Sequence, residues 1–286
     1  MSLYGYKIPT TPFFDSLKQT GRLYALNAIA PTNQTRYSIP IDLTEANVHY
    51  YENRYMHSCS ILTRFKANGY ETNWISNQGR AGKNDSTISS MAYEADTTFF
   101  ANLNYLDAKT DEVLLEYLNK MKSDSPKEMY LIHLMGSHSD YINRYNKEKA
   151  LFKNAKNIVE EYDNTIYYTD YVISRIFERF KGEKVLLIYL SDHGENISLE
   201  NNGHGFLPPY KDEYTVPFVI YSSVKNGRLD ELYKENQKRY FNLENFNAIV
   251  QYVSGISNRK NLSFSPDVIG VEPGNVYNFD TLEVFN

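Results

Sequence analysis

The chain has 286 residues, of which 42% are hydrophobic and 23% charged, a composition that excludes a disordered, collagen-like or disulfide-stapled protein. Its net charge of −5 provides no basic face for a phosphate backbone, so we expect no nucleic-acid partner. The single cysteine, Cys59, excludes an intrachain disulfide, and the longest apolar run, residues 185–190, is far shorter than the roughly 20 residues that span a membrane.

Apolar strand patterns alternate with helical patterns along the whole chain. In chain order they predict a strand at 23–28, a helix from about Tyr37, a helix at 55–67, a strand at 71–76, a helix at 110–121, a strand at 128–134, a helix at 157–180, strands at 184–190 and 215–221, and a helix at 243–253. This alternation predicts an α/β fold with a mostly parallel sheet and helices on both faces. The apolar run at 184–190 is typical of a strand in the middle of such a sheet.

Histidines and carboxylates follow two of the predicted strands. Gly136-Ser137-His138 comes after the strand at 128–134, and Asp192-His193 comes directly after the strand at 184–190, with His204 eleven residues further on. In parallel α/β folds the functional site lies at the carboxyl ends of the strands. Imidazole and carboxylate groups are suitable zinc ligands, so these segments predict a metal site. His133 lies within its strand, and we interpret it as a structural core residue.

A hydroxyl group is predicted at the start of the helix near Tyr37. Pro40 is tolerated only in the first helical turn, which places Thr35 at the N-terminal end of this helix. Backbone N–H groups at a helix N-terminus hold anions, and a hydroxyl beside a metal can attack phosphorus. Taken alone, a threonine at this position is more often a simple N-cap.

These segments together resemble the alkaline-phosphatase/sulfatase superfamily, and within it the phosphoethanolamine transferases of Gram-negative envelopes. The resemblance runs from Ser2 to about Ser223. It rests on Ser2-Leu3-Tyr4-Gly5-Tyr6 with Thr10-Thr11-Pro12, Thr35-Arg36-Tyr37-Ser38-Ile39-Pro40, Gly136-Ser137-His138 with Arg144-Tyr145, Ser191-Asp192-His193-Gly194-Glu195 with Gly203-His204-Gly205, and Tyr214-Thr215-Val216-Pro217-Phe218. It implies an alkaline-phosphatase-like α/β/α sandwich with a mostly parallel central sheet, formed by one catalytic domain over residues 1–286.

The resemblance also implies roles for individual residues. Thr35 is the implied nucleophile and contacts the metal, and Asp192 and His193 are implied zinc ligands. His138 and His204 are implied to bind the donor phosphate or a second metal, and one of them would transfer protons. Asn77 and Gln78 follow the strand at 71–76 and are placed to meet acceptor or phosphate, although loop residues of this kind more often have no such role.

The chain departs from the family pattern in three places. The family's Gly-Glu-Ser precedes the segment that Ser2 begins, so we expect this chain to lack that zinc-ligand glutamate, the family's first strand and its N-terminal membrane helices. One zinc ion, or two, is therefore expected to bind weakly. Pro31 and Ile41 stand where lipid A-modifying members carry cysteines, which favours the branch acting on lipopolysaccharide core sugars or another envelope acceptor over lipid A. Ser139-Asp140 replaces a common Gly-Pro, so different acceptor contacts are expected.

Four interpretations of function remain at this stage. The favoured one is a monomeric enzyme that transfers phosphoethanolamine from phosphatidylethanolamine to an envelope glycolipid through a phosphothreonine, at the periplasmic face of the inner membrane. A phosphatase or phosphodiesterase would use the same groups with water as acceptor. A sulfuric-ester hydrolase would need a formylglycine, but Cys59 lacks the Cys-x-Pro-x-Arg context and lies in the helix predicted at 55–67, where a buried cysteine is expected. A catalytically incomplete fragment is the fourth.

Overall fold

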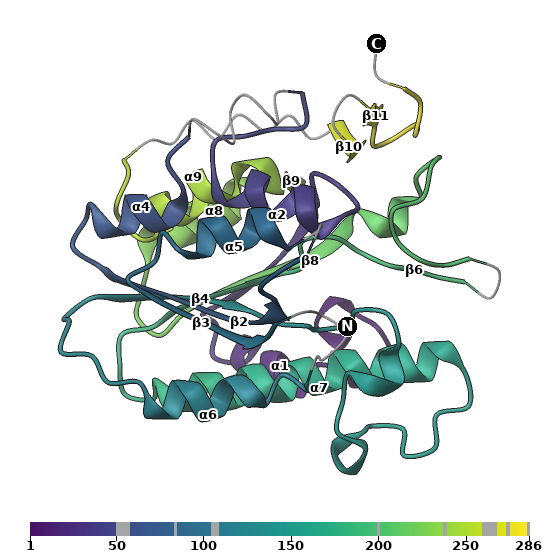
Figure 1. Cartoon of the computed structure of the whole chain (residues 1–286), viewed down its shortest axis with the longest axis horizontal. Coiled ribbons are helices and arrows are strands. Elements are labelled where there is room, and N and C mark those ends of the chain that lie inside the picture. Colours follow the sequence, from purple (N-terminus) through teal and green to yellow (C-terminus); the bar gives the residue numbers. More distant parts are fainter. Residues whose placement is uncertain are drawn as a thin grey trace. The chain divides into compact units, whose positions relative to one another are not determined.

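The structure is a computed structural model that describes residues 1–49, 58–82, 85–103, 109–198, 201–236, 239–258, 268–272 and 275–284. The chain divides into two compact units, each assembled from two stretches of sequence (Figure 1). The first unit combines Met1–Leu23 with Tyr70–Val185, and the second combines Tyr24–Gly69 with Leu186–Asn286. Over the described ranges, no helix is both long and apolar enough to span a bilayer. The expectation of one catalytic domain stays a prediction.

The first unit is built on a parallel sheet with strand order β3-β2-β4, formed by Glu71–Gly79 (β2), Thr97–Asn102 (β3) and Glu128–His133 (β4). The helix α5 (Ser86–Ala92) connects β2 to β3, and α6 (Val113–Lys120) connects β3 back across to β4. Parallel connections are right-handed, and these two run in opposite directions along the sheet. The two helices therefore lie on opposite faces of it (Figure 1).

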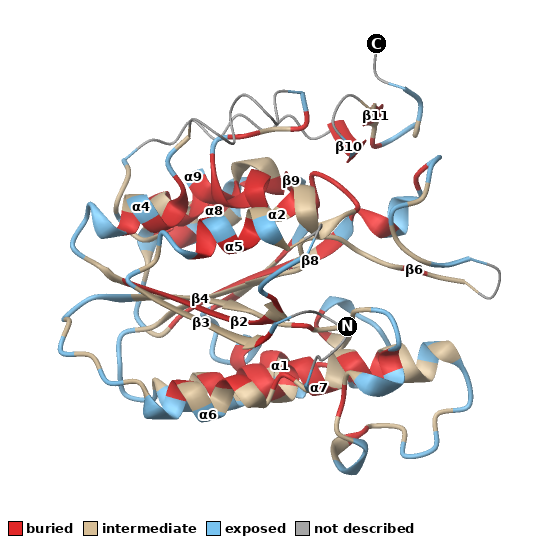
Figure 2. Cartoon of the chain, in the orientation of Figure 1, coloured by how far each residue is buried: buried red, intermediate tan, exposed pale blue. Residues whose placement is uncertain are grey.

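The helix α7 (Ile158–Arg179) packs one of its sides into the core of this unit. Tyr168, Val172 and Ile176 recur every four residues and pack with Ile75 of β2 and Leu114 of α6. Figure 2 shows buried residues along one side of α7, whereas the other side is mostly intermediate with a few exposed residues. The predicted helices at 110–121 and 157–180 and the strands at 71–76 and 128–134 are confirmed. The remaining elements of the unit are α1 (Pro12–Lys18) and the 3₁₀ turns Ser2–Tyr4, Tyr141–Asn143 and Lys147–Lys149.

The second unit contains a mixed sheet with strand order β5-β8-β1-β9, formed by Leu23–Ile29 (β1), Leu186–Leu190 (β5), Thr215–Ser222 (β8) and Tyr240–Asn242 (β9). β1 and β9 run parallel, whereas β5 and β8 run antiparallel. The strands predicted at 23–28, 184–190 and 215–221 are therefore confirmed. The predicted place of the strand at 184–190 is wrong, because β5 is at one end of the strand order and all its residues are half-buried. A short apolar run does not reveal how many of its faces are covered.

Helices and two small hairpins complete the second unit. The helices are α2 (Thr35–Leu43), α4 (Ile61–Lys66), α8 (Gly227–Asn236) and α9 (Phe246–Val253), with 3₁₀ turns at Lys211–Glu213 and Leu243–Asn245. The hairpins pair β6 (Asn196–Ile197) with β7 (Asn202–Gly203), and β10 (Val268–Glu272) with β11 (Asn275–Asn278). Phe218 of β8 makes edge-on ring contacts with Phe241 of β9 and Phe246 of α9, which anchor α9 on the sheet.

The helix predicted at 55–67 is shorter in the structure. Residues 55–57 lie outside the described part of the chain, and α4 begins at Ile61, where the Ser60 hydroxyl accepts a hydrogen bond from the Thr63 N–H at 3.3 Å. Cys59 therefore precedes the helix. It is exposed, so the expectation of a buried cysteine is wrong. A serine N-cap stops the helix from extending back to the preceding residues.

The helix α2 begins at Thr35 rather than near Tyr37, which places Pro40 at its sixth position. The sequence argument confined proline to the first helical turn, and the structure corrects it. Pro40 has no N–H for the carbonyl group of Arg36, so one hydrogen bond of this nine-residue helix is missing. Thr35 is nevertheless at the N-terminus of α2, as the sequence analysis predicts.

Asp42 is a buried carboxyl group near the C-terminal end of α2. Its side chain is 1% exposed, and among the described residues neither carboxyl oxygen has a hydrogen-bond partner. Burial, and then the negative charges of Asp192 and Glu244, raise the pKa of Asp42 well above its usual value. The folded state therefore binds a proton at Asp42 more tightly than the unfolded chain does, and the parent loses stability as the pH rises from about 4 towards the raised pKa.

Replacing Asp42 with asparagine should therefore stabilise the chain at high pH. We expect Asp42→Asn to raise the free energy of unfolding by at least about 1 kcal/mol at pH 8, with a smaller gain at pH 5, because the unfolded parent is favoured at high pH by releasing the proton that the buried carboxyl must hold, and asparagine has no such proton. Urea unfolding at the two pH values measures the difference. Asp212→Asn, which alters an exposed carboxylate of the same unit, is the control and should change stability little at either pH. A loss of stability in Asp42→Asn at pH 8 would contradict this account.

Candidate functional site

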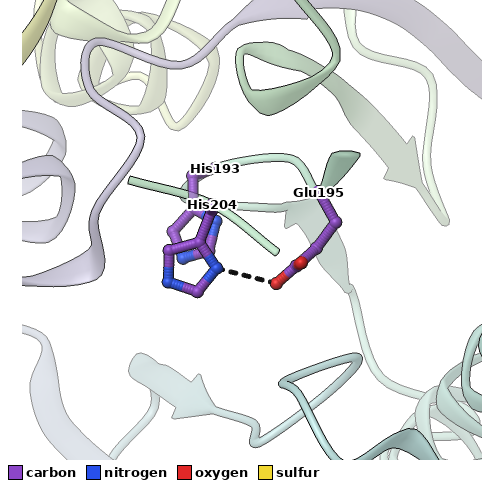
Figure 3. Close-up of side chains that lie close together, drawn as sticks. All are labelled: His193, Glu195 and His204. Carbon is purple, nitrogen blue, oxygen red and sulfur yellow. Dashed lines mark hydrogen bonds and ion pairs between the residues drawn. The ribbon is translucent and has the colours of Figure 1, made fainter. Parts of the chain in front are cut away.

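The end of β5 and the β6–β7 hairpin bring three metal-binding side chains together in the second unit. Asp192, His193 and Glu195 follow β5, and His204 follows β7. Asn196 of β6 pairs with Gly203 of β7, so the residues just outside this pair, Glu195 and His204, face each other at the open end of the hairpin. Figure 3 shows the side chains of His193, Glu195 and His204 turned towards one another.

The distances within this cluster suit a metal ion. Nδ1 of His204 is 2.8 Å from Oε1 of Glu195, and the rings of His193 and His204 are 4.0 Å apart between centroids. One ligand atom from each of the three residues lies within 4.8 Å of the other two. Two imidazoles and a carboxylate form a donor set that zinc accepts, and catalytic zinc sites commonly use three protein ligands. The residues present therefore fit the implied metal.

Thr35 lies against this cluster from the start of α2. Its Oγ1 is 3.1 Å from Nε2 of His193, and Oδ2 of Asp192 is 3.8 Å from the same nitrogen. Nδ1 of His193 is 2.9 Å from the carbonyl oxygen of Gly194, so in a neutral ring Nδ1 carries the hydrogen and donates it to that carbonyl. The lone pair of Nε2 is then directed at the Thr35 hydroxyl. It can accept that proton or bind a metal beside the hydroxyl.

Glu213 holds the segments around the cluster in place. Its side chain is fully buried and accepts hydrogen bonds from the Asn33 amide at 3.0 Å and from the backbone N–H groups of Phe206 and Tyr210 at 3.0 and 2.7 Å. Its own carbonyl oxygen accepts the N–H of Gly194 at 2.7 Å. A Cβ at Gly194 would lie 2.0 Å from the Asp212 carbonyl oxygen, so only glycine fits next to His193.

The electrostatics of the cluster favour the protonated form of His204. Burial on its own would lower the pKa of this histidine. Its hydrogen bond to Glu195, together with the charges of Glu195, Asp192 and Glu213, outweighs that effect and raises the pKa above its usual value. In the absence of metal, the protonated form of His204 is therefore favoured beside the ring of His193.

The structure brings together four of the residues predicted from the sequence, namely Thr35, Asp192, His193 and His204. It adds Glu195, which the sequence argument quoted within a motif but did not treat as a ligand. Glu195 joins the site through the β6–β7 hairpin, which pairs the residues just inside Glu195 and His204. Strands of two residues are too short to leave a periodic pattern in the sequence, so this hairpin could not be predicted.

The other predicted site residues belong to the first unit. His138 lies in the loop after β4, and its Nδ1 is 3.2 Å from the Ser139 hydroxyl. Gln78 in β2 donates to the Leu134 carbonyl at 3.0 Å. Asn77 is fully buried, and its amide donates to the Lys109 carbonyl at 2.7 Å and to Asp111 at 2.8 Å, an arrangement that favours a structural role. Contacts of these residues with a substrate stay predictions.

His133 has the structural role expected of it. It is the last residue of β4, and its ring makes an edge-on contact with the fully buried ring of Trp74, with 6.0 Å between centroids. His133 is half-buried, and this contact with an aromatic side chain is consistent with a structural role.

Comparison with known proteins assigns the family. The family model described as Sulfatase matches residues 1–256. The chain belongs to the Sulfatase family. The match includes Thr35 and the whole His193, Glu195 and His204 cluster, and it confirms the resemblance drawn from the sequence motifs.

Known relatives of this Sulfatase-family chain include phosphoethanolamine transferases. EptC of Escherichia coli O18:K1:H7, named a phosphoethanolamine transferase, is 28% identical over 250 residues, which cover 79% of this chain and 43% of that protein. The chain thus spans less than half the length of the curated relatives it matches. More than half of EptC therefore has no counterpart in this match.

Solved structures establish the fold. The crystal structure of the C-terminal periplasmic domain of EptC from Escherichia coli, in complex with Zn, matches with a TM-score of 0.82 and 23% identity over 98% of this chain and 88% of that domain. A protein of the alkaline phosphatase superfamily from Vibrio parahaemolyticus matches with a TM-score of 0.60 and 18% identity over 89% of this chain and 62% of that one. The fold is therefore alkaline-phosphatase-like α/β, as predicted.

Proposed function

We propose that the protein transfers phosphoethanolamine from phosphatidylethanolamine to an envelope glycolipid through a phosphothreonine at Thr35. The observation that carries this proposal is the 3.1 Å contact between Oγ1 of Thr35 and Nε2 of His193, at the N-terminal end of α2. A hydroxyl group facing an unprotonated imidazole nitrogen is the arrangement that an activated nucleophile requires. The names of the relatives support phosphoethanolamine as the transferred group.

The residues of the second unit suggest how the first half-reaction would run. The Thr35 hydroxyl releases its proton to water, and its Oγ1 forms a bond to phosphorus as the bond between phosphorus and the diacylglycerol oxygen breaks. A histidine, either His204 or His138, donates a proton to the departing oxygen. The N-terminal end of α2 favours the negative charge on the phosphoryl oxygens. Bound zinc, held by Asp192 and His193 with Glu195 and His204 beside them, would supply Lewis acidity and lower the pKa of the Thr35 hydroxyl.

The second half-reaction would return the enzyme to its starting state. A hydroxyl group of the acceptor attacks the phosphorus of phosphothreonine, and the Thr35 oxygen leaves. The acceptor gives up its proton to the histidine that protonated the diacylglycerol oxygen, either His204 or His138, and the Thr35 oxygen takes up a proton from water as it leaves. Lipopolysaccharide core and lipid A both carry suitable hydroxyl groups. We assign the reaction to the periplasmic face of the inner membrane and expect the protein to act as a monomer.

Release of diacylglycerol distinguishes a transferase from a hydrolase. A transferase protects its phosphothreonine from water, so without acceptor the release should stop near one equivalent per enzyme, and added glycolipid should restart it. A phosphatase or phosphodiesterase would release diacylglycerol and free phosphoethanolamine continuously. The measurement uses the complete natural polypeptide with a fluorescent phosphatidylethanolamine. Continuous release that glycolipid does not alter would contradict the transferase proposal.

A further inference from the structure

The loop that carries His138 in the first unit is held by a buried carboxylate. Asp111 is 2% exposed, and its Oδ1 accepts the N–H of Met135 at 2.8 Å while its Oδ2 accepts the N–H of Gly136 at 2.9 Å. These two residues immediately precede Ser137-His138. Both oxygens of a single buried side chain thus fix consecutive peptide groups at the start of the loop.

This carboxylate is part of a hydrogen-bond chain across three parallel strands. The amide of Asn102, the last residue of β3, donates to the carbonyl and side-chain oxygens of Asn77 at 2.6 and 2.7 Å. The amide of Asn77 in β2 donates to Oδ1 of Asp111 at 2.8 Å. Asp111 in turn holds the residues that follow β4. The order of these contacts follows the strand order β3-β2-β4, so the sheet itself fixes the position of the loop.

Other contacts hold the far side of the same loop. The Ser137 hydroxyl shares a hydrogen bond of 2.7 Å with Thr165 of α7, and the Arg144 guanidinium donates to the carbonyl oxygens of His138 and Ser139 at 3.3 and 3.1 Å. Gly136 has φ of +57°, a left-handed conformation that favours glycine. The backbone on both sides of His138 is therefore fixed.

The Asp111 side chain does not cap the helix that follows it. It lies two residues before α6, but the side chain makes no cap of that helix, whose N-cap is Glu112. All of the hydrogen bonds given above for its carboxylate go to the loop before His138 or to Asn77. A buried carboxylate costs free energy unless it is well hydrogen-bonded. Capping of α6 does not explain why one is buried here.

We propose that Asp111 is a positioning residue that fixes the Gly136-Ser137-His138 turn and thereby the imidazole of His138. The inference rests on the proposed function, in which His138 contacts the phosphate or transfers a proton. Because Asp111 acts only through the backbone of the loop, its loss should reduce the rate through His138 and not through a contact of its own. Placement errors of about 1 Å in such groups can reduce rates by about a hundredfold.

Asp170 offers a matched control in the same unit. It is 1% exposed, and its two oxygens accept the backbone N–H groups of Phe13 and Phe14 at 2.7 and 3.1 Å, at the start of α1. Asparagine keeps the size of either side chain but has one acceptor oxygen in place of two. Asp111→Asn and Asp170→Asn should therefore lose comparable stability, and only the first should disturb the loop that carries His138.

The test compares the two variants in the complete natural polypeptide. We expect Asp111→Asn to lower the rate of phosphoethanolamine transfer at least ~10-fold, and Asp170→Asn to stay within about twofold of the parent. Amide hydrogen exchange at Met135 and Gly136 should accelerate in Asp111→Asn only. In a His138→Ala background, Asp111→Asn should cause no further loss of rate. If Asp111→Asn does not fold, Asp111→Glu takes its place, since it keeps the carboxylate but displaces it by one methylene group.

Three results would overturn the inference, and only one of them also counts against the proposed function. If His138→Ala is inactive while Asp111→Asn matches the rate of Asp170→Asn, Asp111 does not position His138 and the proposed function is unaffected. If His138→Ala is fully active, the role given to this histidine in the proposed function fails, and the inference fails with it. Unchanged exchange at Met135 and Gly136 in Asp111→Asn would show directly that the carboxylate does not hold the loop.

Discussion

Thr35→Val is expected to lower the rate of phosphoethanolamine transfer by at least ~10³-fold, the order of loss seen when an enzyme loses its nucleophile. Valine keeps the β-branched shape of threonine, so the start of α2 should stay intact while the hydroxyl that faces His193 at 3.1 Å is removed. A loss of this size corresponds to about 4 kcal/mol of transition-state stabilisation. The rate is measured with a fluorescent phosphatidylethanolamine and an envelope glycolipid.

Ser38→Ala is the matched control for this variant. Ser38 is a second hydroxyl of α2, one turn further along, but it is fully buried and shares a hydrogen bond of 2.7 Å with Thr32. Its replacement should cost about 1 kcal/mol of stability and leave the transfer rate within a few fold of the parent. Thr35→Ser, which keeps a hydroxyl group, should retain part of the activity. Full activity in Thr35→Val would show that another group attacks phosphorus.

His193→Ala is expected to reduce the zinc affinity of the chain by at least ~100-fold and to abolish transfer, because His193 links the Thr35 hydroxyl to the other donors of the cluster. Calorimetric titration of the metal-free protein with zinc measures the affinity. A chelator should abolish the activity of the parent in the same way, and added zinc should restore it. Glu195→Gln should weaken zinc binding less, because the amide oxygen remains a possible ligand.

The control for the zinc experiment is His49→Ala. His49 is an exposed histidine of the same unit that is not part of the cluster, so its replacement should leave the zinc affinity unchanged. If tight zinc binding survived in His193→Ala, the metal would be held elsewhere and the assignment of the cluster would fail. An equal loss in His49→Ala would indicate non-specific binding at exposed imidazoles.

The sequence was sufficient for those parts of the fold and site that depend on local patterns. Asp192-His193 could be placed from the apolar strand that precedes it, because that signal is local. The proline at position 40 indicated a nearby helix but put its start about two residues too late, so Thr35 was singled out chiefly by the resemblance of residues 35–40 to the family's nucleophile motif. The place of β5 in its sheet could not be predicted, since it depends on antiparallel pairing with β8, some 30 residues away. A single apolar run is compatible with either an end or a central strand.

Residues whose role depends on contacts distant in sequence were harder to predict. Glu195 joins the cluster only because a hairpin of two-residue strands returns the chain to it. Asn77 follows the pattern of a loop residue at a strand end, yet it lies in β2 and its amide is used by Asp111 and Lys109, more than 30 residues away. Cys59 was expected inside a helix, but Ser60 caps α4 just after it. Such partners are not visible in local periodicity.

The mass of the peptide that contains Thr35 tests the central claim most directly. The complete natural polypeptide is incubated with phosphatidylethanolamine without acceptor, digested and analysed by mass spectrometry. The account predicts that this peptide gains the mass of one phosphoethanolamine group, that the gain disappears when glycolipid acceptor is added, and that no such peptide forms in Thr35→Val. Phosphoethanolamine attached to a different residue, with transfer intact in Thr35→Val, would contradict the account.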